Sequence, residues 1–219
     1  MSEPSSVAVR DGHSLETISF REYRPADLQR CVEITADAWP EFDRSMQLAT
    51  VEWYLGSVTR KEVACISGIA VGVLFGKIDS DLTAFDRLKI SLSHVKVYLK
   101  MFFGLYGRLP HRIAVIRNCL STDRKIAANS PDIDGEVKFF AVDTAYRGKG
   151  IGQALMGRFI DHAKNKGAKK IFVYTTAPGS DWTFYERYGF RKHSSFRDDY
   201  MSFARKEEVA AIFYVLDIE

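Results

Sequence analysis

The chain has 219 residues, a hydrophobic fraction of 46% and a formal net charge of +3. With about 150 residues per domain as a guide, this length predicts one domain with room for an elaboration. A domain of this size buries roughly 70% of its unfolded surface, so its stability requires neither a disulfide nor a metal. The composition excludes a wholly disordered chain, a collagen-like fibre and a polytopic membrane protein. The small positive charge gives no reason to expect a nucleic-acid partner.

The cysteines, the histidines and the N-terminal residues favour a metal-free protein of a reducing compartment. The cysteines Cys31, Cys65 and Cys119 are widely spaced and form no C-x-x-C pair, which argues against a zinc site or a disulfide framework. None of the five histidines has the spacing of metal ligands. The first residues lack an apolar signal core, and no run of 18 uncharged apolar residues occurs. We therefore expect a cytoplasmic protein without a membrane-spanning helix.

The first half of the chain predicts a strand, two helices and two further strands. We assign residues 1–15 to a flexible leader and residues 16–219 to a single domain. Apolar and polar residues then alternate as in a half-buried strand, and Pro25 with Asp27 favours a helix start. The expected elements are a strand at 18–23, helices at about 25–38 and 46–58, and strands at 62–67 and 69–77 joined by a tight turn at Gly68.

The second half returns to alternating strands and helices after an interruption at 80–134. The expected elements are strands at 136–142 and 169–175, helices at 150–166 and 181–188, and a long apolar strand at 209–218 that closes the sheet. This order of elements predicts a mixed α/β (α+β) layered domain.

The insert at about 80–134 has an unusual composition. Residues 80–117 hold seven basic and two acidic side chains, a charge of +5 that leaves −2 (3 minus 5) for the rest of the chain. Apolar residues step by three and four along a helical stripe of about six turns: Phe85, Leu88, Leu92, Val95, Leu99, Phe102 and Tyr106. Three interpretations stay open: a helix docked on its own domain, a lid or dimer element beside a substrate pocket, and a basic helix resting on an anionic membrane.

The strongest local pattern is the glycine-rich turn that follows the strand at 136–142. Gly148, Gly150 and Gly152 open the next helix, and Arg147 and Lys149 add positive charge. Glycines let a ligand approach the backbone, and free N–H groups at a helix start bind anions. The turn is therefore expected to hold a phosphate or pyrophosphate, although a glycine-rich turn without a ligand is the plain alternative.

Two common phosphate loops do not fit this turn. A Walker loop requires Ser or Thr after Gly-Lys, whereas Gly148-Lys149 is followed by Gly150. A dinucleotide fingerprint requires glycine at the sixth position, where Gln153 or Leu155 stands. The turn therefore belongs to another class of anion site.

The run R-G-K-G-I-G after a strand that ends in A-V-D resembles the acetyl-CoA-binding motif of the GCN5-related N-acetyltransferase (GNAT) superfamily. Arg147, Gly150 and Gly152 supply the family pattern, and residues 185–190 (Y-E-R-Y-G-F) resemble its late motif. The resemblance implies a mostly antiparallel central sheet flanked by helices, here with a helical insertion. It also implies that acetyl-CoA is the cosubstrate.

The resemblance places the cofactor between the strands at 136–142 and 169–175. It implies that backbone groups of Phe140, Ala141 and Val142 pair with the pantetheine arm, and that the Phe140 N–H donates to the thioester carbonyl. The residues implied to hold the pyrophosphate are Arg147, Gly148, Lys149, Gly150, Ile151, Gly152 and Gln153. One departure stands out, because residues 177–182 (A-P-G-S-D-W) lack the asparagine that family members often carry near the pantetheine arm.

Two catalytic roles follow from the same resemblance. Tyr185 matches the usual general acid, which would protonate the departing thiolate; the alternative is that it only packs against the cofactor. Glu136 falls where one branch of the family carries its base, acting directly or through water; a solvated strand-end carboxylate explains it nearly as well.

The expected function is transfer of an acetyl group from acetyl-CoA to a primary amine by direct attack in a ternary complex. The amine belongs to a small molecule or a peptide, and Glu41 and Asp43 could attract it or simply form a solvated turn. Two rival functions are a non-catalytic acyl-CoA sensor and a membrane or protein interaction module that works through the insert. A homodimer is possible.

Overall fold

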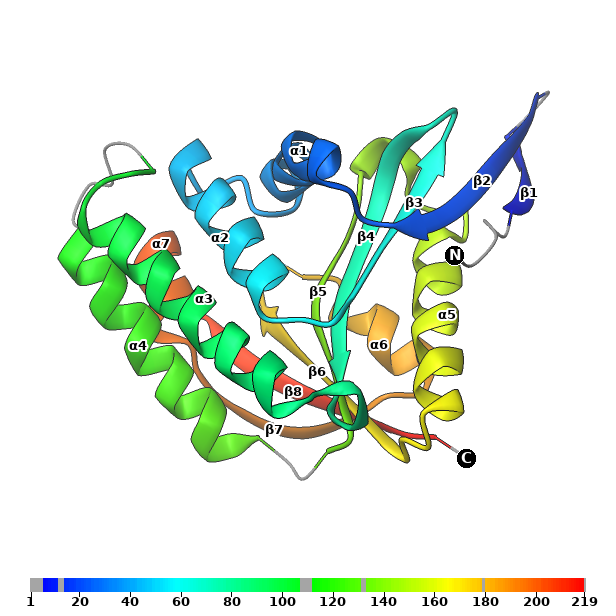
Figure 1. Ribbon diagram of the computed structural model, residues 1–219. Helices are drawn as coiled ribbons and strands as arrows, with labels where there is room; N and C mark the ends of the chain where they lie inside the picture. Colours follow the sequence, from blue (N-terminus) through cyan, green and yellow to red (C-terminus); the bar gives the residue numbers. More distant parts are fainter. Residues whose placement is uncertain (1–5, 12–13, 107–111, 131–132, 179, 219) are drawn as a thin grey trace.

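The computed structural model describes residues 6–11, 14–106, 112–130, 133–178 and 180–218. They form one eight-stranded sheet with helices on both faces (Figure 1). The strands in spatial order are β1 (Ser6–Asp11), β2 (Ser14–Glu22), β3 (Arg60–Ile66), β4 (Ile69–Ile78), β5 (Gly135–Val142), β6 (Lys170–Ala177), β8 (Ala210–Asp217) and β7 (Arg191–Arg197). Neighbouring strands are antiparallel except β5 and β6, which are parallel. The expected mixed, mostly antiparallel sheet is confirmed.

The helices divide between the two faces of the sheet. Their bounds are α1 (Leu28–Ala38), α2 (Arg44–Gly56), α3 (Ala84–Phe102), α4 (Arg112–Asn129), α5 (Ile151–Asn165), α6 (Trp182–Tyr188) and α7 (Asp199–Arg205). One core packs α5 and α6 against the sheet, and a second packs α1 and α2 against its other face. A third core joins α2, α3, α4 and α7 beyond the sheet. The insert therefore enlarges the α1–α2 side of the molecule.

The N-terminal residues differ from the expected leader. Ser6–Asp11 pair with Ser14–Ser19 as a β-hairpin, so the prediction of a flexible segment is wrong for residues 6–11. The alternation of Val7 and Val9 with more polar neighbours is the pattern that a strand needs. Residues 1–5 and 12–13 of the expected leader lie outside the described residues.

The last strand also lies elsewhere than expected. β8 runs between β6 and β7 and pairs with both, so the apolar run at 209–218 does not form the edge of the sheet. β7 forms that edge, and its sequence R-K-H-S-S-F-R suits an exposed edge because charged residues discourage pairing with another chain. The short helix α7 between them was not expected from the sequence.

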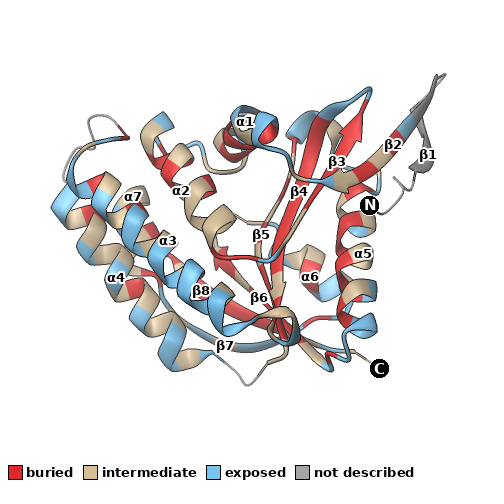
Figure 2. Ribbon diagram, in the orientation of Figure 1, coloured by how far each residue is buried: buried red, intermediate tan, exposed pale blue. Residues whose placement is uncertain are grey.

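The insert consists of α3 and α4, which lie side by side (Figure 1). A capping box starts α3, in which the Thr83 hydroxyl accepts from the Asp86 N–H at 3.1 Å and the Asp86 carboxylate accepts from the Thr83 N–H at 3.0 Å. Val97 and Met101 are the buried residues of α3. The predicted helix does dock on its own domain, but through Val97 and Met101, whereas the stripe residues from Phe85 to Phe102 are exposed (Figure 2).

Strands β5 and β6 separate soon after they meet. Their parallel pairing covers only Gly135–Val137 against Ile171–Val173, although β5 runs on to Val142. Beyond Val137, the backbone edge of β5 that faces β6 therefore forms no strand pairing with it. A pair of splayed strands of this kind leaves backbone N–H and C=O groups for a ligand.

Candidate active site

The anion-binding turn is built as the sequence predicts. Gly148 and Gly150 have φ values of 78° and 76°, in the left-handed region that favours glycine. Gly150 caps α5 and offers no side chain to its first N–H groups, so these are left for a ligand. The helix dipole adds partial positive charge at the same place. The start of α5 is thus a site for a phosphate group.

Two buried contacts fix the turn to the rest of the domain. The carboxylate of Asp143 accepts from the Ala145 N–H at 2.9 Å and forms an ion pair with Arg30 of α1. Arg30 also donates to the carbonyl of Ala70 on β4 at 2.9 Å. Asp143 therefore holds the turn in place.

Gly152 brings α5 close to β5. A Cβ atom at this position would lie 3.1 Å from Cζ of Phe140 and 3.6 Å from Cε2 of Phe184. A larger residue would push the Phe140 ring away from the helix, so the third glycine of the motif is explained by packing.

A cavity of about 750 Å³ runs from this turn to the insert. Of the residues predicted to hold a cofactor, those that line it are Phe140, Ala141, Val142, Arg147, Gly148, Gly150, Ile151, Gly152 and Gln153. Lys149 is not among the lining residues, and its ammonium lies 5.4 Å from the centre of the Tyr146 ring. The free edge of β5, the glycine turn and the cavity together fit an extended ligand that ends in a pyrophosphate.

The comparisons with known proteins agree with this geometry. Residues 119–190, which include the turn and the late motif, match the model of the acetyltransferase (GNAT) family. This segment of the chain is similar to GNAT acetyltransferases. A search of curated proteins finds no match.

Solved structures confirm the GNAT fold at low sequence identity. A polyamine N-acetyltransferase from Drosophila melanogaster is 17% identical, with a TM-score of 0.54 over 92% of this chain and 100% of its own. The ribosomal-protein-S18-alanine N-acetyltransferase from Escherichia coli is 14% identical, with a TM-score of 0.55 over 92% and 94%. A putative acetyltransferase from Salmonella typhimurium, solved with acetyl-CoA, is 16% identical, with a TM-score of 0.52 over the same shares. The GNAT family, whose model residues 119–190 match, uses acetyl-CoA.

Tyr185 lies in the wall of the cavity. It is on α6, its side chain is largely buried, and its ring packs against Phe190 and Tyr214 at centroid distances of 5.8 and 6.1 Å. Burial raises the pKa of its hydroxyl above the ordinary value near 10. The hydroxyl therefore keeps its proton at neutral pH, as an acid must before it acts.

Glu136 lies beside the cavity but not among the residues that line it. Its carboxylate is buried and pairs with Lys138 at 2.8 Å and with Lys77 at 3.6 Å. The register of β4 and β5 skips Lys138, which marks a β-bulge next to Glu136. The bulge places Lys138 in the cavity wall and leaves Glu136 behind it.

The far end of the cavity is lined by aromatic residues and by the insert. The aromatic side chains there are Trp39, Phe42, Trp53, Tyr54, Tyr98, Phe139, Tyr174 and Tyr200. Tyr98 of α3 donates a hydrogen bond of 2.7 Å to Asp123 of α4. Burial raises the pKa of the Asp123 carboxyl, an effect that the Tyr98 hydrogen bond and the charge of Lys138 oppose.

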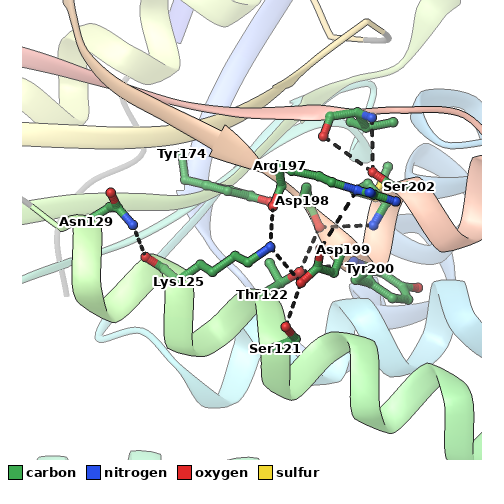
Figure 3. Close-up of polar contacts among 12 residues, drawn as sticks. Ser121, Thr122, Lys125, Asn129, Tyr174, Arg197, Asp198, Asp199, Tyr200 and Ser202 are labelled. Atoms are coloured by element: carbon green, nitrogen blue, oxygen red, sulfur yellow. Dashed lines mark hydrogen bonds and ion pairs between the residues drawn. The ribbon is translucent and has the colours of Figure 1, made fainter.

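Asp198 is a buried carboxylate at the same end, and its oxygens already accept hydrogen bonds, whereas Asp123 is only half-buried. It accepts from the Thr122 hydroxyl at 2.9 Å, from the Met201 N–H at 3.0 Å and from the Tyr174 hydroxyl (Figure 3). It thereby caps α7 and joins it to α4 and β6. Asp123, by contrast, has Tyr98 as its one hydrogen-bond partner among the described residues.

The hydroxyl of Tyr200 is buried in the cavity wall and has no hydrogen-bond partner within the described part of the chain. Burial also raises its pKa well above the ordinary value. A buried hydroxyl without a partner is costly, so this group is available to a polar atom of a bound ligand.

Two residues near the first helices do not take part as the sequence suggests. Asp43 caps α2 by accepting from the Met46 N–H at 2.9 Å, and Glu41 pairs with Arg205 at 2.7 Å. Neither lines the cavity. At the position of the missing asparagine, the Ser180 hydroxyl lies 2.6 Å from that of Thr175 in the cavity wall.

Sequence reasoning missed Tyr98, Asp123 and Tyr200. The sequence does set Asp123 apart, because it is the only acidic residue within 112–129. The basic residues of this segment are Arg112, Arg117, Arg124 and Lys125. A single acid in a basic helix indicates a specific partner, which here is Tyr98. No group of three or more potential metal ligands clusters among the described residues.

Proposed function

We propose that this domain transfers the acetyl group of acetyl-CoA to the primary amine of a small molecule, by direct attack in a ternary complex. The observation that carries the proposal is a single cavity joining the anion-binding turn to an aromatic chamber that contains the half-buried carboxylate of Asp123. Donor and acceptor can thus meet without leaving the protein, which supports direct transfer.

The donor half of the cavity would hold acetyl-CoA. The N–H groups at the start of α5, with Arg147, would bind the pyrophosphate, and the free edge of β5 at Phe140–Val142 would pair with the pantetheine arm. The bound cosubstrate supplies an activated acetyl thioester. The Phe140 N–H would donate to its carbonyl oxygen, where negative charge develops during attack.

Tyr185 would supply the proton that the departing thiolate needs. Its place in the wall, its burial and its raised pKa support this role. A protonated phenol held in an apolar site is a suitable donor to a thiolate formed beside it.

Glu136 would act as the base through water rather than by direct contact. Its carboxylate lies behind the bulge and is separated from the cavity by Lys138. A water molecule is the shortest relay from such a position to an amine in the cavity. Replacement of Glu136 by Gln is expected to lower kcat while leaving KM for acetyl-CoA unchanged; an unchanged kcat at every pH would remove Glu136 from the reaction.

The acceptor half favours a cationic amine with an apolar or aromatic body. The carboxylate of Asp123 lines the cavity with Tyr98 as its one hydrogen-bond partner among the described residues, and aromatic faces attract an ammonium. The cavity must hold the acyl end of the donor as well, so its volume of about 750 Å³ suits a small acceptor rather than a folded protein.

A panel of amines tests the function and its acceptor class together. The purified protein is incubated with acetyl-CoA and matched arylalkyl amines, alkyl amines and amino acids, and free thiol and acetylated product are measured. We expect turnover with the apolar amines and weak turnover with amino acids, whose carboxylate would meet Asp123. Binding of acetyl-CoA without thiol release above background, for any amine, would favour the acyl-CoA sensor.

A further inference from the structure

The outward face of α3 carries a continuous row of exposed apolar side chains. Phe85, Leu88, Leu92, Val95, Leu99 and Phe102 are between 51% and 72% exposed. Their spacing of three and four residues places them on one side of the helix. We name these six residues the apolar row. Apolar patches of this extent on a protein surface mark a site of interaction.

Further apolar residues are exposed after the end of α3 and on α4. They are Phe103 and Leu105 after the helix, and Ile113 and Leu120 on α4. The opposite side of α3 is already used, because Val97 and Met101 are buried and Lys100 pairs with Glu52 of α2 at 2.6 Å. The helix is therefore fixed to the domain with its apolar row directed outward (Figure 2).

The charges around the apolar row are basic. Lys89 and Lys96 are exposed and are three residues before and four residues after Leu92, so both adjoin the row. Arg87, Arg112, Arg117 and Arg124 are exposed on the same two helices. The only acids within 84–106 and 112–129 are Asp86 and Asp123. Asp86 caps the helix through Thr83, and Asp123 pairs with Tyr98 at the cavity.

We propose that the apolar row and its flanking cations dock the domain on an anionic membrane surface. An amphipathic helix with long basic side chains beside apolar ones inserts the apolar side chains between lipids and places its cations among the headgroups. No helix in the described residues is long and apolar enough to cross a membrane, so the helix would lie in the interface.

The positive charge of this face favours an anionic membrane over a second copy of this chain as its partner. In a two-fold symmetric dimer the same face meets itself, which would bring two sets of these cations together. The face offers no exposed acid among the residues of α3 and α4 to neutralise them. An anionic bilayer supplies both an apolar layer and negative charge, and so complements both properties of the face.

Vesicle sedimentation tests the proposal. The full chain is mixed with vesicles of phosphatidylcholine alone or with phosphatidylserine, at low and high salt. We expect sedimentation with the serine-containing vesicles, little with phosphatidylcholine alone, and weaker binding at high salt. Equal binding to both vesicles, or none to either, would overturn the proposal.

Paired variants separate the two parts of the surface. Leu92→Glu should abolish sedimentation, and the double variant Lys89→Gln/Lys96→Gln should weaken vesicle affinity roughly thirty-fold, at about fivefold per cation. The matched controls are Ile69→Glu, at an exposed apolar residue of the β3–β4 hairpin, and Lys164→Gln/Lys192→Gln on α5 and β7. Circular dichroism confirms that each variant folds. Unchanged binding of the α3 variants would overturn the proposal.

The oligomeric state supplies the competing outcome. Light scattering across a range of concentrations should show a monomer for the wild-type chain. A dimer that Leu92→Glu dissociates, with no binding to serine-containing vesicles, would show that a second copy covers the face and would overturn the membrane proposal.

Discussion

The phenol oxygen of Tyr98 lies 2.7 Å from Oδ2 of Asp123 and joins the two helices of the insert at the wall of the cavity. The contact links α3 to α4 and orients a carboxylate toward the space where an acceptor would bind. Asp123 lies within the segment that matches the GNAT family model, whereas Tyr98 precedes it. Both helices of the insert thus contribute side chains to the far end of the cavity.

Replacement of Asp123 by Asn should weaken acceptor binding and leave the donor half intact. The loss of a charge-assisted hydrogen bond to an ammonium, about 1.5–3 kcal/mol, corresponds to a KM for the amine raised roughly 10- to 100-fold. The KM for acetyl-CoA and the kcat at saturating amine should change little. Steady-state kinetics with both substrates varied measures the three constants, and Tyr98→Phe serves as a control that keeps the carboxylate. An unchanged amine KM would show that Asp123 does not bind the acceptor.

Replacement of Tyr185 by Phe should lower kcat by about 10² to 10³, the usual contribution of one acid–base group. The ring contacts with Phe190 and Tyr214 remain in the variant, so the free energy of unfolding should change little. Single-turnover kinetics isolates the chemical step. A variant that folds and turns over at the wild-type rate, with chemistry rate-limiting, would leave Tyr185 only a packing role.

Replacement of Gly150 by Glu should abolish acetyl-CoA binding, because a carboxylate would stand where the pyrophosphate is expected. The φ of 76° also disfavours any side chain, at a cost of about 1–2 kcal/mol. Gly68→Glu in the β3–β4 turn is the matched control, since its φ is 81° and it also has open space around it. Calorimetry should show lost binding for the first variant and wild-type affinity for the second. Equal affinities would contradict the assignment of the turn.

The free energy of unfolding should fall in mild acid because of a histidine at the contact between α2 and α3. His94 stacks on Trp53 at 3.9 Å and lies 2.5 Å from the Ser57 hydroxyl. Burial lowers its pKa from 6.5 to about 4. As pH falls through this range, the unfolded chain binds a proton before the folded protein does, so the free energy of unfolding decreases.

Denaturant unfolding at pH 7 and pH 4.5 measures this effect. His94→Gln should lose less stability between the two pH values than the wild-type protein loses. His193→Gln, at an exposed histidine of β7, is the control and should keep the wild-type difference. An identical difference for His94→Gln would place the acid sensitivity elsewhere.

The donor half of the site could be predicted from the sequence because its determinants are local. A strand, a glycine turn and a helix start are contiguous over 136–153, and each is recognisable from a few neighbouring residues. The fold followed from the same local patterns. The structure differs from the prediction at β1, where residues with the alternation of Val7 and Val9 form a strand and not a flexible leader. It also differs in the position of β8 within the sheet, because the order of strands depends on contacts between residues far apart in the sequence.

The acceptor half could not be predicted because its residues come from distant elements. Tyr98, Asp123, Tyr174 and Tyr200 belong to α3, α4, β6 and α7 and meet only in the folded chain. The apolar stripe of α3 was visible in the sequence, but periodicity does not say whether such a stripe faces the core or the solvent. The position of Glu136 depends on a bulge at Lys138, which no local pattern marks.

Acetyl transfer to a small amine is tested most directly by the release of free CoA from the wild-type chain in the presence of acetyl-CoA and a small apolar amine. Thiol detection and mass spectrometry of the amine, compared with Tyr185→Phe and Asp123→Asn under the same conditions, give the result. One acetylated amine is expected for each CoA released, with turnover strongly reduced in Tyr185→Phe and restored in Asp123→Asn by a high amine concentration. Tight binding of acetyl-CoA with no acetylated amine and no CoA release would contradict the proposed acetyl transfer.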